Sequence, residues 1–531
     1  MKLNQKELAN TKAWADAGIK LPLYDRAKVI AVTKTKPTWV HCGAGNLFRI
    51  FPAARLQALL DSGIADTGVI VAGSRESIDA VFAPHDNMNL NVTLKADGSI
   101  GKEVLGSITE ALAFDSAGAD WNRLKEIFRA PGLQMVSFTI TEKGYSLENG
   151  GKPLPDVADD FTAGPAAPKS YIGKVAALLH ERFRAGKSPV AMVSMDNCSR
   201  NGDRLAAAVR AFAAEWVGAG LVEQGFIDYL DSSVSFPWSM IDKITPSPDE
   251  GVRKMLLACG FEDVDAVVTR KNTCVAPFVN AEETEYLIIE DLFPNGRPPL
   301  DKAGVIFTDR ATVGKVEKMK VCTCLNPLHT ALAVYGCLLG FSKISEEMKD
   351  RDLRRLVEII GYDEGLPVVV DPGIITPRDF IDEVVNIRFP NPFVPDTPQR
   401  IATDTSQKLP IRFGETIKAY MASPALNVAR LRLIPLVHAG WCRYLLGVDD
   451  AGREFAVSPD PMLDEVSGRL KGLRPGDKGP FSANLKPILS DARIFGVDLY
   501  AVGLGERVEG YFAELMAGPG AVRATLHKYT S

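Results

Sequence analysis

One stretch near the start of the chain decides the fold: TWVHCGAGNLFRIF (residues 38–51). A β-rich run ends in a glycine-rich turn, and a helical pattern follows at once. Such a turn lets backbone N–H groups and the start of the helix approach a pyrophosphate closely. Because Phe48 replaces the third glycine of the usual fingerprint, an ordinary β-to-α turn is the competing interpretation. The predicted dinucleotide contacts are Gly43, Ala44, Gly45, Asn46, Leu47 and Phe48.

Alternating β-rich and helical runs continue from this turn to about residue 300. The β-rich runs are PTWVHC (37–42), GVIVAG (68–73), LQMVSFTIT (133–141), PVAMVSMD (189–196) and AGVIFTD (303–309). Amphipathic segments lie between them, such as FPAARLQALLDSG (51–63) and PKSYIGKVAALLHERFRAG (168–186). Strands separated by helices predict an α/β fold with a Rossmann-type, doubly wound, mostly parallel sheet.

Helical patterns dominate the remainder of the chain. They are HTALAVYGCLLG (329–340), EEMKDRDLRRLVEIIG (346–361), PRDFIDEVVNIRF (377–389), ETIKAYMAS (415–423) and REFAVSPDPMLDEVSGRLKGL (453–473). A chain of 531 residues is long for one domain, so we expect two. The first, residues 1–305, is an NAD(P)-binding Rossmann-type domain with an N-terminal helical extension. The second, residues 306–531, is a mainly helical substrate and catalytic domain.

Composition narrows the classes of partner. The chain is 46% hydrophobic and 24% charged, with a net charge of -5, as in a globular protein with sizeable cores. A mildly acidic surface does not attract nucleic acid or an anionic membrane. We see no run of about 18 apolar residues, no signal-like N-terminus, and eight cysteines without a disulfide-like spacing. We expect a cytoplasmic protein, a monomer or small homo-oligomer, that binds a small molecule.

The end of the second β-rich run, VIVAGSRES (69–77), bears on the choice between NAD and NADP. Ser74 and Arg75 stand where an acidic residue usually contacts the ribose 2′-OH. An arginine can instead accept a 2′-phosphate. We predict that both residues contact the cofactor, with NAD as the first expectation and NADP left open.

Polar segments follow several β-rich runs. They are TITEKGY (139–145), SMDNCSRNG (194–202), which contains Asn197, and FPWSMIDKITP (236–246), which contains Asp242. The first two fall at the carboxyl ends of predicted strands, where ligands bind in open α/β sheets. Taken singly, such residues are also common in turns, where they bond their own backbone.

A catalytic set is suggested by VEKMKVCTCLNPLHTALAVYG (316–336), which holds Lys320, Asn326 and His329. Alcohol oxidation needs a base for the hydroxyl proton and donors that stabilise the alkoxide. A lysine serves as base when burial or neighbouring cations lower its pKa. The competing interpretations are a solvated Lys320 with a core His329, or a metal bound by cysteines and His329. Cys-x-Cys directs its thiols to different helix faces, so we predict no metal.

A cationic segment, IRFPNPFVPDTPQRIATDTSQKLPIR (387–412), suits binding of a carboxylate or a polyhydroxylated substrate. Its cations are Arg388, Arg400, Lys408 and Arg412. Arginine binds carboxylates in a bidentate manner. A solvated charged face is the alternative, but the proline, asparagine and serine content does not suit a plain amphipathic helix.

In this order, these stretches resemble the mannitol dehydrogenase family of long-chain polyol dehydrogenases, over roughly residues 38–412. The resemblance implies a metal-independent, NAD(P)-dependent oxidoreductase with a Rossmann-type domain followed by a helical domain. It also implies roles for individual residues. Lys320 would be the general base, Asn197 and Asn326 would stabilise the alkoxide, His329 would hydrogen-bond the substrate, and Asp242, Arg400 and Lys408 would be further substrate contacts.

Within that family, the cationic segment favours reduction of D-fructuronate to D-mannonate. A tagaturonate reductase and a mannitol 2-dehydrogenase are the alternatives. From another class, a non-catalytic nucleotide-binding sensor would keep the glycine turn and lose the chemistry.

The chain departs from the family pattern beside its predicted base. The step from Lys320 to Asn326 is one residue longer than in the family, which turns Lys320 by about 100° on a regular helix. Pro327 also lies inside the motif, where its ring would disturb the helix. We therefore predict a π-type bulge between residues 320 and 327. A regular helix with Lys320 in solvent would instead make Lys318 the next candidate. Trp238, at a position that is often small and polar, is a second departure.

Overall fold

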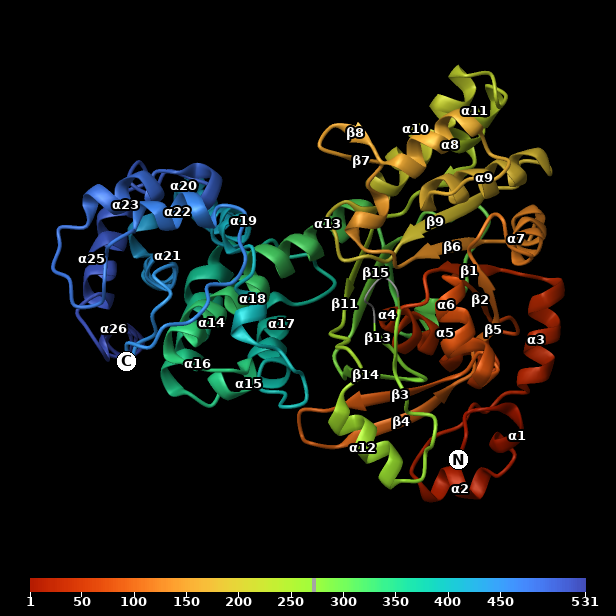
Figure 1. Cartoon of the computed structure of the whole chain (residues 1–531), viewed down its shortest axis with the longest axis horizontal. Coiled ribbons are helices and arrows are strands. Elements are labelled where there is room, and N and C mark those ends of the chain that lie inside the picture. The colour runs from red at the N-terminus through yellow and green to blue at the C-terminus, as the bar shows by residue number, and fades with distance from the viewer. Residues whose placement is uncertain (270–273) are drawn as a thin grey trace. The chain divides into compact units, whose positions relative to one another are not determined.

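The computed structural model describes residues 1–269 and 274–531. These residues form two compact units, Met1–Gly314 and Lys315–Ser531. Figure 1 shows a first unit of strands and helices and a second unit built from helices.

The main sheet of the first unit is parallel throughout. Its strands are β1 (Trp39–Cys42), β2 (Val69–Gly73), β5 (Ile108–Ala113), β6 (Met135–Phe138), β9 (Val190–Ser194) and β10 (Val234–Ser235). Their spatial order is β5-β2-β1-β6-β9-β10, and neighbouring strands run parallel. This is the Rossmann order, and its crevice opens where the order reverses, between β1 and β6.

Alternate residues of the central strands pack on opposite faces of this sheet. Val40 on β1 and Ile70 on β2 belong to a core with α7 (Asp120–Arg129), α9 (Tyr171–Arg184) and α10 (Asn201–Gly218). Trp39 and Val69 belong to a second core with α3 (Arg26–Thr35) and α5 (Pro52–Asp61). Helices therefore cover both faces (Figure 1), and the predicted doubly wound α/β fold is confirmed.

One expected strand lies outside the main sheet, and several strands, among them β5 and β10 of the main sheet, were not predicted. The run at 303–309 forms β16 (Ile306–Thr308), but β16 pairs in a separate sheet with β15 (Tyr286–Glu290), which also pairs with β11 (Ser239–Asp242). Strand β5 was not predicted because ITEALA has neither strong alternation nor β-branched enrichment. A third sheet joins β3 (Asn89–Leu94) to β4 (Ile100–Leu105) and β14 (Phe278–Glu282).

The second unit is mainly helical, as predicted. Its longer helices are α14 (Asn326–Leu339), α16 (Arg351–Glu358), α20 (Glu415–Ala422), α21 (Leu433–Tyr444), α23 (Ser482–Leu489), α25 (Gly505–Leu515) and α26 (Ala521–Thr530). Helix α21 is buried along its whole length and packs against α14 and α25. The helix predicted over 453–473 is shorter, α22 (Leu463–Arg469), because Pro459 and Pro461 remove backbone donors before it.

The helical run Arg310–Leu339 is long and apolar enough to cross a membrane by length and composition alone. In this structure 83% of its most apolar window is buried inside the protein. That burial is typical of a core helix, since a membrane span exposes its apolar side chains to lipid.

Candidate active site

At the glycine turn after β1, Gly43 packs closely against the protein, whereas Gly45 borders open space. Gly43 has φ +137°, and a Cβ there would lie 2.7 Å from the carbonyl oxygen of Thr139. Only glycine fits this position. Gly45 has φ −78° and caps α4 (Asn46–Ile50), and no atom lies within 4 Å of a Cβ built on it. The backbone at Gly45 is therefore accessible to a ligand.

His41 on β1, which the sequence did not single out, packs beside this turn. The imidazole of His41 lies 2.8 Å from Ser137 Oγ and 2.9 Å from Thr139 Oγ1. Its ring stacks on Phe48 at 3.5 Å between centroids, and burial holds the pKa of His41 well below its usual value. Because the Phe48 side chain is fully buried, its predicted cofactor contact is limited to the backbone. The sequence signal for His41 was its position as a polar residue inside an apolar strand.

The side chain of Asn46 is held by the protein itself. Arg49 Nη2 donates to Asn46 Oδ1 at 2.8 Å, and Arg49 Nη1 donates to the Ala276 carbonyl at 2.8 Å. Burial lowers the pKa of Arg49 to about 9. This arginine fixes the first turn of α4, on which the predicted dinucleotide contacts stand.

At the end of β2, the residues predicted to select the cofactor have partners of their own. Ser74 Oγ accepts from the Ser77 N–H and caps the short helix that follows. Arg75 Nη2 donates to Asp120 Oδ2 at 3.1 Å, and the same oxygen accepts from the Ala113 N–H at 2.9 Å. Asp120 thus pairs with the cation that the sequence places near the ribose.

The segment after β9 holds one residue with a structural role, Asp196, and one candidate site residue, Asn197. The carboxylate of Asp196 accepts from the N–H groups of Ile140 and Thr141, at 2.9 and 2.8 Å, and from the Tyr145 hydroxyl. Burial raises the pKa of this carboxyl group, and these hydrogen bonds oppose the rise. Asp196 therefore ties the ends of β6 and β9 together, whereas Asn197 beside it is exposed.

Asn201 connects the same strand end to β11. Its Nδ2 donates to the carbonyls of Asp196 and Ser239, both at 3.0 Å, and its Oδ1 accepts from the Ser239 N–H at 3.0 Å. The predicted substrate contact Asp242 is the buried last residue of β11. Asn201 is thus a structural residue that fixes the strand carrying Asp242.

Trp238, the residue that departs from the family pattern, is held by charged neighbours. Its Nε1 donates to Asp203 at 2.8 Å. The guanidinium groups of Arg310 and Arg200 lie 5.1 and 5.5 Å from its ring. These contacts explain a large aromatic side chain here, because a cation is attracted to the face of an indole.

The predicted bulge is present. A π-turn, η5 (Lys320–Cys324), separates α13 (Arg310–Met319) from α14, and the Leu325 N–H donates to the Lys320 carbonyl at 3.1 Å. Pro327 falls in the first turn of α14, where no backbone donor is needed.

Lys320 is 3% exposed, so the solvated-lysine interpretation is wrong. Lys318, the fallback candidate, has a side chain that is 53% exposed.

The cationic segment gathers around His329. Together with burial, which is the largest cause, four surrounding cations hold the pKa of His329 well below its usual value. These are the described residues Arg412, Arg400, Arg388 and Lys408. The imidazole is therefore neutral at physiological pH. The alternative interpretation of this segment, a solvated charged face, is excluded for Arg388, which is buried.

Two of these cations are fixed by carbonyl and hydroxyl oxygens. Arg412 Nη1 donates to Thr330 Oγ1 at 2.6 Å and to the Asn326 carbonyl at 3.3 Å, and burial lowers the pKa of Arg412 to about 10. Lys408 Nζ donates to the Ile401 carbonyl at 3.0 Å, and burial, assisted by Arg412, lowers the pKa of Lys408 to about 8. Arg412 thereby joins the cations to the start of α14.

Further π-turns carry cations of this cluster. Arg388 ends η8 (Val384–Arg388), and Arg412 lies within η9 (Pro410–Gly414), which packs against η5. Such turns are rare and are frequent at functional sites. Their recurrence at Lys320, Arg388 and Arg412 marks this part of the second unit as the candidate catalytic surface.

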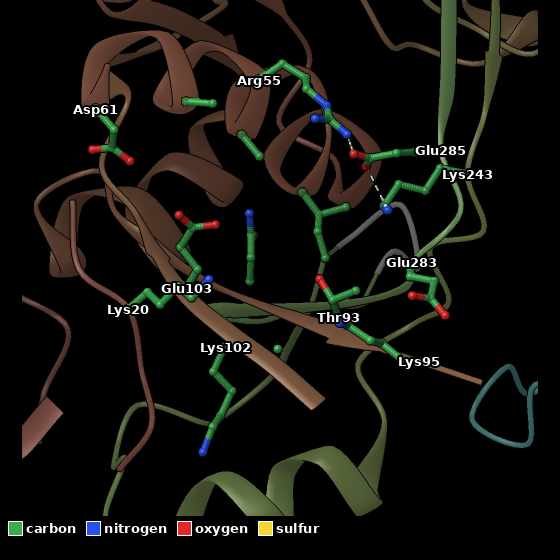
Figure 2. Close-up of a pocket in the computed structure, with 15 residues that line it drawn as sticks. Lys20, Arg55, Asp61, Thr93, Lys95, Lys102, Glu103, Lys243, Glu283 and Glu285 are labelled. Atoms are coloured by element: carbon green, nitrogen blue, oxygen red, sulfur yellow. Dashed lines mark ion pairs between the residues drawn. The ribbon is translucent and has the colours of Figure 1, made fainter. Parts of the chain in front are cut away.

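A separate cavity of about 370 Å³ lies in the first unit, between α5 and the sheet of β3 and β4 (Figure 2). Its charged lining residues are Lys20, Arg55, Asp61, Lys95, Lys102, Glu103, Lys243, Glu283 and Glu285. Figure 2 shows Arg55 and Lys243 directed toward Glu285, with Lys243 Nζ 2.9 Å from its carboxylate. The residues that line this cavity do not include those predicted for the site.

The sulfur atoms near the predicted base do not favour metal binding. Burial raises the pKa of Cys322 to about 11 and that of Cys324 to about 12, so both remain thiols. Within the described residues, no group of three or more His, Cys, Asp or Glu side chains is arranged to hold a metal ion. Metal-independent chemistry remains our prediction.

The fold and these side chains define a class: dehydrogenases in which a Rossmann domain precedes a helical domain. The model for the mannitol dehydrogenase Rossmann domain matches residues 37–302, and the model for the mannitol dehydrogenase C-terminal domain matches residues 312–502. The chain belongs to the mannitol dehydrogenase family and is an oxidoreductase.

Individual relatives span almost the whole chain. The D-mannonate oxidoreductase of Thermotoga maritima is 54% identical, and the alignment covers 99% of each chain. The mannitol 2-dehydrogenase of Neosartorya fischeri is 31% identical and covers 94% of this chain and 93% of its own. The Pseudomonas fluorescens mannitol 2-dehydrogenase, solved as a ternary complex with NAD and D-mannitol, superposes with a TM-score of 0.72 at 27% identity, over 99% of each chain.

Proposed function

We propose that this protein is an NAD-dependent oxidoreductase that interconverts D-mannonate and D-fructuronate. The observation that carries the proposal is the group of cations around His329, Arg388, Arg400, Lys408 and Arg412. Several cations gathered around one site suit an anionic substrate, because arginine and lysine side chains bind a carboxylate through charged hydrogen bonds. The 54% identity to a D-mannonate oxidoreductase supports the same substrate.

The glycine turn has the features that a dinucleotide needs. The space beside Gly45 leaves its backbone accessible, and Gly43 closes the turn against β6. Gly43, Ala44, Gly45 and the backbone of Asn46, Leu47 and Phe48 would hold the pyrophosphate, with Ser74 and Arg75 near the adenosine ribose. NAD, when bound, supplies the hydride acceptor. Because Arg75 is already paired with Asp120, we assign NAD rather than NADP.

The chemical roles follow from charge state and burial. Lys320, buried at the start of its π-turn, is assigned as the base that takes the hydroxyl proton. Asn326 and Asn197 are assigned as amide donors that stabilise the alkoxide. His329, kept neutral by burial and by the cations around it, donates one hydrogen bond to a substrate hydroxyl. Asp242 is assigned to a second hydroxyl.

Arg400 and Lys408 are assigned to the substrate carboxylate, which distinguishes a hexonate from a neutral polyol. D-mannitol offers no counter-charge to these cations, so we rank mannitol oxidation lower. We further propose that the protein acts in the cytoplasm, as a monomer or small homo-oligomer, without nucleic acid or a membrane.

Initial rates of NADH formation test this assignment. The enzyme is given D-mannonate, D-altronate or D-mannitol, each with NAD and with NADP. We expect D-mannonate with NAD to show the largest kcat/KM. A larger kcat/KM for D-altronate or D-mannitol would overturn the substrate assignment, and nucleotide binding without any turnover would favour the sensor.

A further inference from the structure

One carboxylate, that of Asp396, contacts two of the residues assigned to the substrate. Its Oδ2 lies 3.1 Å from His329 Nε2, and its Oδ1 accepts from Arg400 Nη2. The Asp396 side chain is 7% exposed. Its backbone is fixed on both sides, because its carbonyl accepts from the Ile344 N–H at 3.0 Å and its N–H donates to the Val394 carbonyl at 2.8 Å.

The two contacts differ in kind. The contact to Arg400 is a charge-assisted hydrogen bond. The contact to His329 has hydrogen-bond length without hydrogen-bond geometry at Nε2, so it is a close contact between a neutral imidazole and the carboxylate. The Phe389 ring lies 5.1 Å from the imidazole and limits its movement. Asp396 therefore anchors Arg400 and lies beside the imidazole.

We infer that Asp396 is a positioning residue, which holds Arg400 in place for the substrate carboxylate. This inference rests on the proposed function. The Arg400 side chain is 63% exposed, so without its anchor it would sample many rotamers. Ordering those rotamers at each binding event weakens affinity for an anionic substrate. Because Asp396 already orders the Arg400 side chain in the free enzyme, substrate binding no longer requires that loss of entropy.

The helical unit contains a matched control. Asp449 and Arg453 form another ion pair between residues four apart, in which Arg453 Nε donates to Asp449 Oδ2 at 2.8 Å. As in the pair of Asp396 and Arg400, the acidic side chain is buried (8% exposed) and the arginine is exposed (71%). A general loss of stability from removing a buried carboxylate will affect Asp449→Asn and Asp396→Asn alike. An effect on substrate affinity will affect only Asp396→Asn.

The test is a double-mutant cycle with D-mannonate and NAD. Asp396→Asn and Arg400→Ala are each expected to raise KM for D-mannonate about tenfold or more, because each removes one partner of a charged hydrogen bond. The double variant should add little to either, since both changes break one interaction. Asp396→Glu should restore part of the affinity, and NADH affinity, measured by its fluorescence, should not change.

Fully additive effects on KM would overturn the inference, as would an unchanged KM in Asp396→Asn. If Asp396→Asn does not fold, the comparison of Arg400→Ala with Asp396→Glu still reports the coupling. A failure of the proposed function is distinguishable, because it appears in the wild type as a preference for another substrate. The cycle is then repeated with that substrate.

Discussion

The carbonyl oxygen of Lys320 accepts a hydrogen bond from the N–H of Leu325, five residues further along, at 3.1 Å. An α-helix would bond residues four apart. The extra residue between Lys320 and Asn326 is therefore contained in one wide turn, and α14 begins regularly at Asn326.

The first prediction concerns Lys320 as base. We expect Lys320→Met, which keeps an unbranched side chain in a buried position, to lower kcat about 10²- to 10⁴-fold. Its affinity for NADH should stay unchanged, because the assigned dinucleotide contacts lie elsewhere. Steady-state kinetics and a fluorescence titration measure the two effects. Lys318→Met is the control, and if it lost as much activity as Lys320→Met, the base would be wrongly assigned.

The glycine turn gives a paired prediction. Gly43→Ala places a Cβ against the Thr139 carbonyl at a positive φ, so it should destabilise the fold by about 2 kcal/mol or more. Gly45→Ala meets open space at a φ that alanine accepts, so the unfolding free energy should change little. Its NADH affinity should fall about tenfold or more, because the methyl group blocks the pyrophosphate. Urea unfolding and NADH titration separate the two, and normal NADH binding by Gly45→Ala would contradict the site.

Cofactor choice is predicted to depend on Asp120. Asp120→Asn keeps an oxygen for the Ala113 N–H but removes the charge that pairs with Arg75. The released guanidinium should then attract a 2′-phosphate and raise NADPH affinity about tenfold, with NADH affinity unchanged. Asp79→Asn is the control, since Asp79 lies 3.9 Å from Arg75 Nη1. Equal NADPH affinity in both variants would show that Arg75 does not face the ribose.

Lys408 predicts a pH dependence of substrate binding. Burial lowers its pKa from 10.5 to about 8, so the ammonium is charged below that pH and neutral above it. Affinity for D-mannonate should be constant at lower pH and fall by up to about tenfold per pH unit above about 8. Calorimetry of D-mannonate binding to the enzyme–NADH complex measures this without turnover. Lys408→Arg should flatten the profile, and a flat wild-type profile would remove Lys408 from the carboxylate site.

A buried carboxylic acid predicts a pH dependence of stability. Glu347 on α15 (Ile344–Glu347) is fully buried, and its carboxyl oxygens have no hydrogen-bond partner among the described residues. Burial raises its pKa well above 4.5. The folded state therefore keeps a proton that the unfolded state releases, and stability falls as pH rises above 4.5 through the folded pKa.

Glu347→Gln should make the melting temperature less sensitive to pH over that window, because the amide does not ionise. Scanning calorimetry at several pH values measures the slope. Glu346→Gln is the control, since Glu346 is an exposed neighbour paired with Lys349. Equal slopes in the wild type and in Glu347→Gln would contradict the assignment.

The sequence predicted those features that depend on local pattern. Val40 and Cys42 lie in an apolar run between helical segments, and such runs form parallel strands because both faces are buried. Gly43 and Gly45 predicted the turn. Residues around Lys320 could be predicted to leave regular helix, since an extra residue and Pro327 both conflict with it.

Other features depend on contacts distant in sequence. Asp396 could not be assigned from its surroundings, because it lies in an irregular segment and His329, which it contacts, lies on α14, far earlier in the chain. His41 looked like one more strand residue, and its hydroxyl partners Ser137 and Thr139 lie on the neighbouring strand and its loop. The π-turn at Arg412 has no local signal, and the pairing of β16 outside the main sheet is decided by strands far along the chain.

The wide turn at Lys320 also affects how relatives should be aligned with this chain. An alignment anchored on Asn326 and His329 and kept free of gaps places Val321 where the family has its lysine. By that alignment the chain would be classed as lacking the lysine that we assign as its base. A gap opened within η5, where the structure accommodates the additional residue, aligns Lys320 with the family lysine. Loss of function should therefore be inferred for members of this family only after the gap position has been checked against the helix geometry.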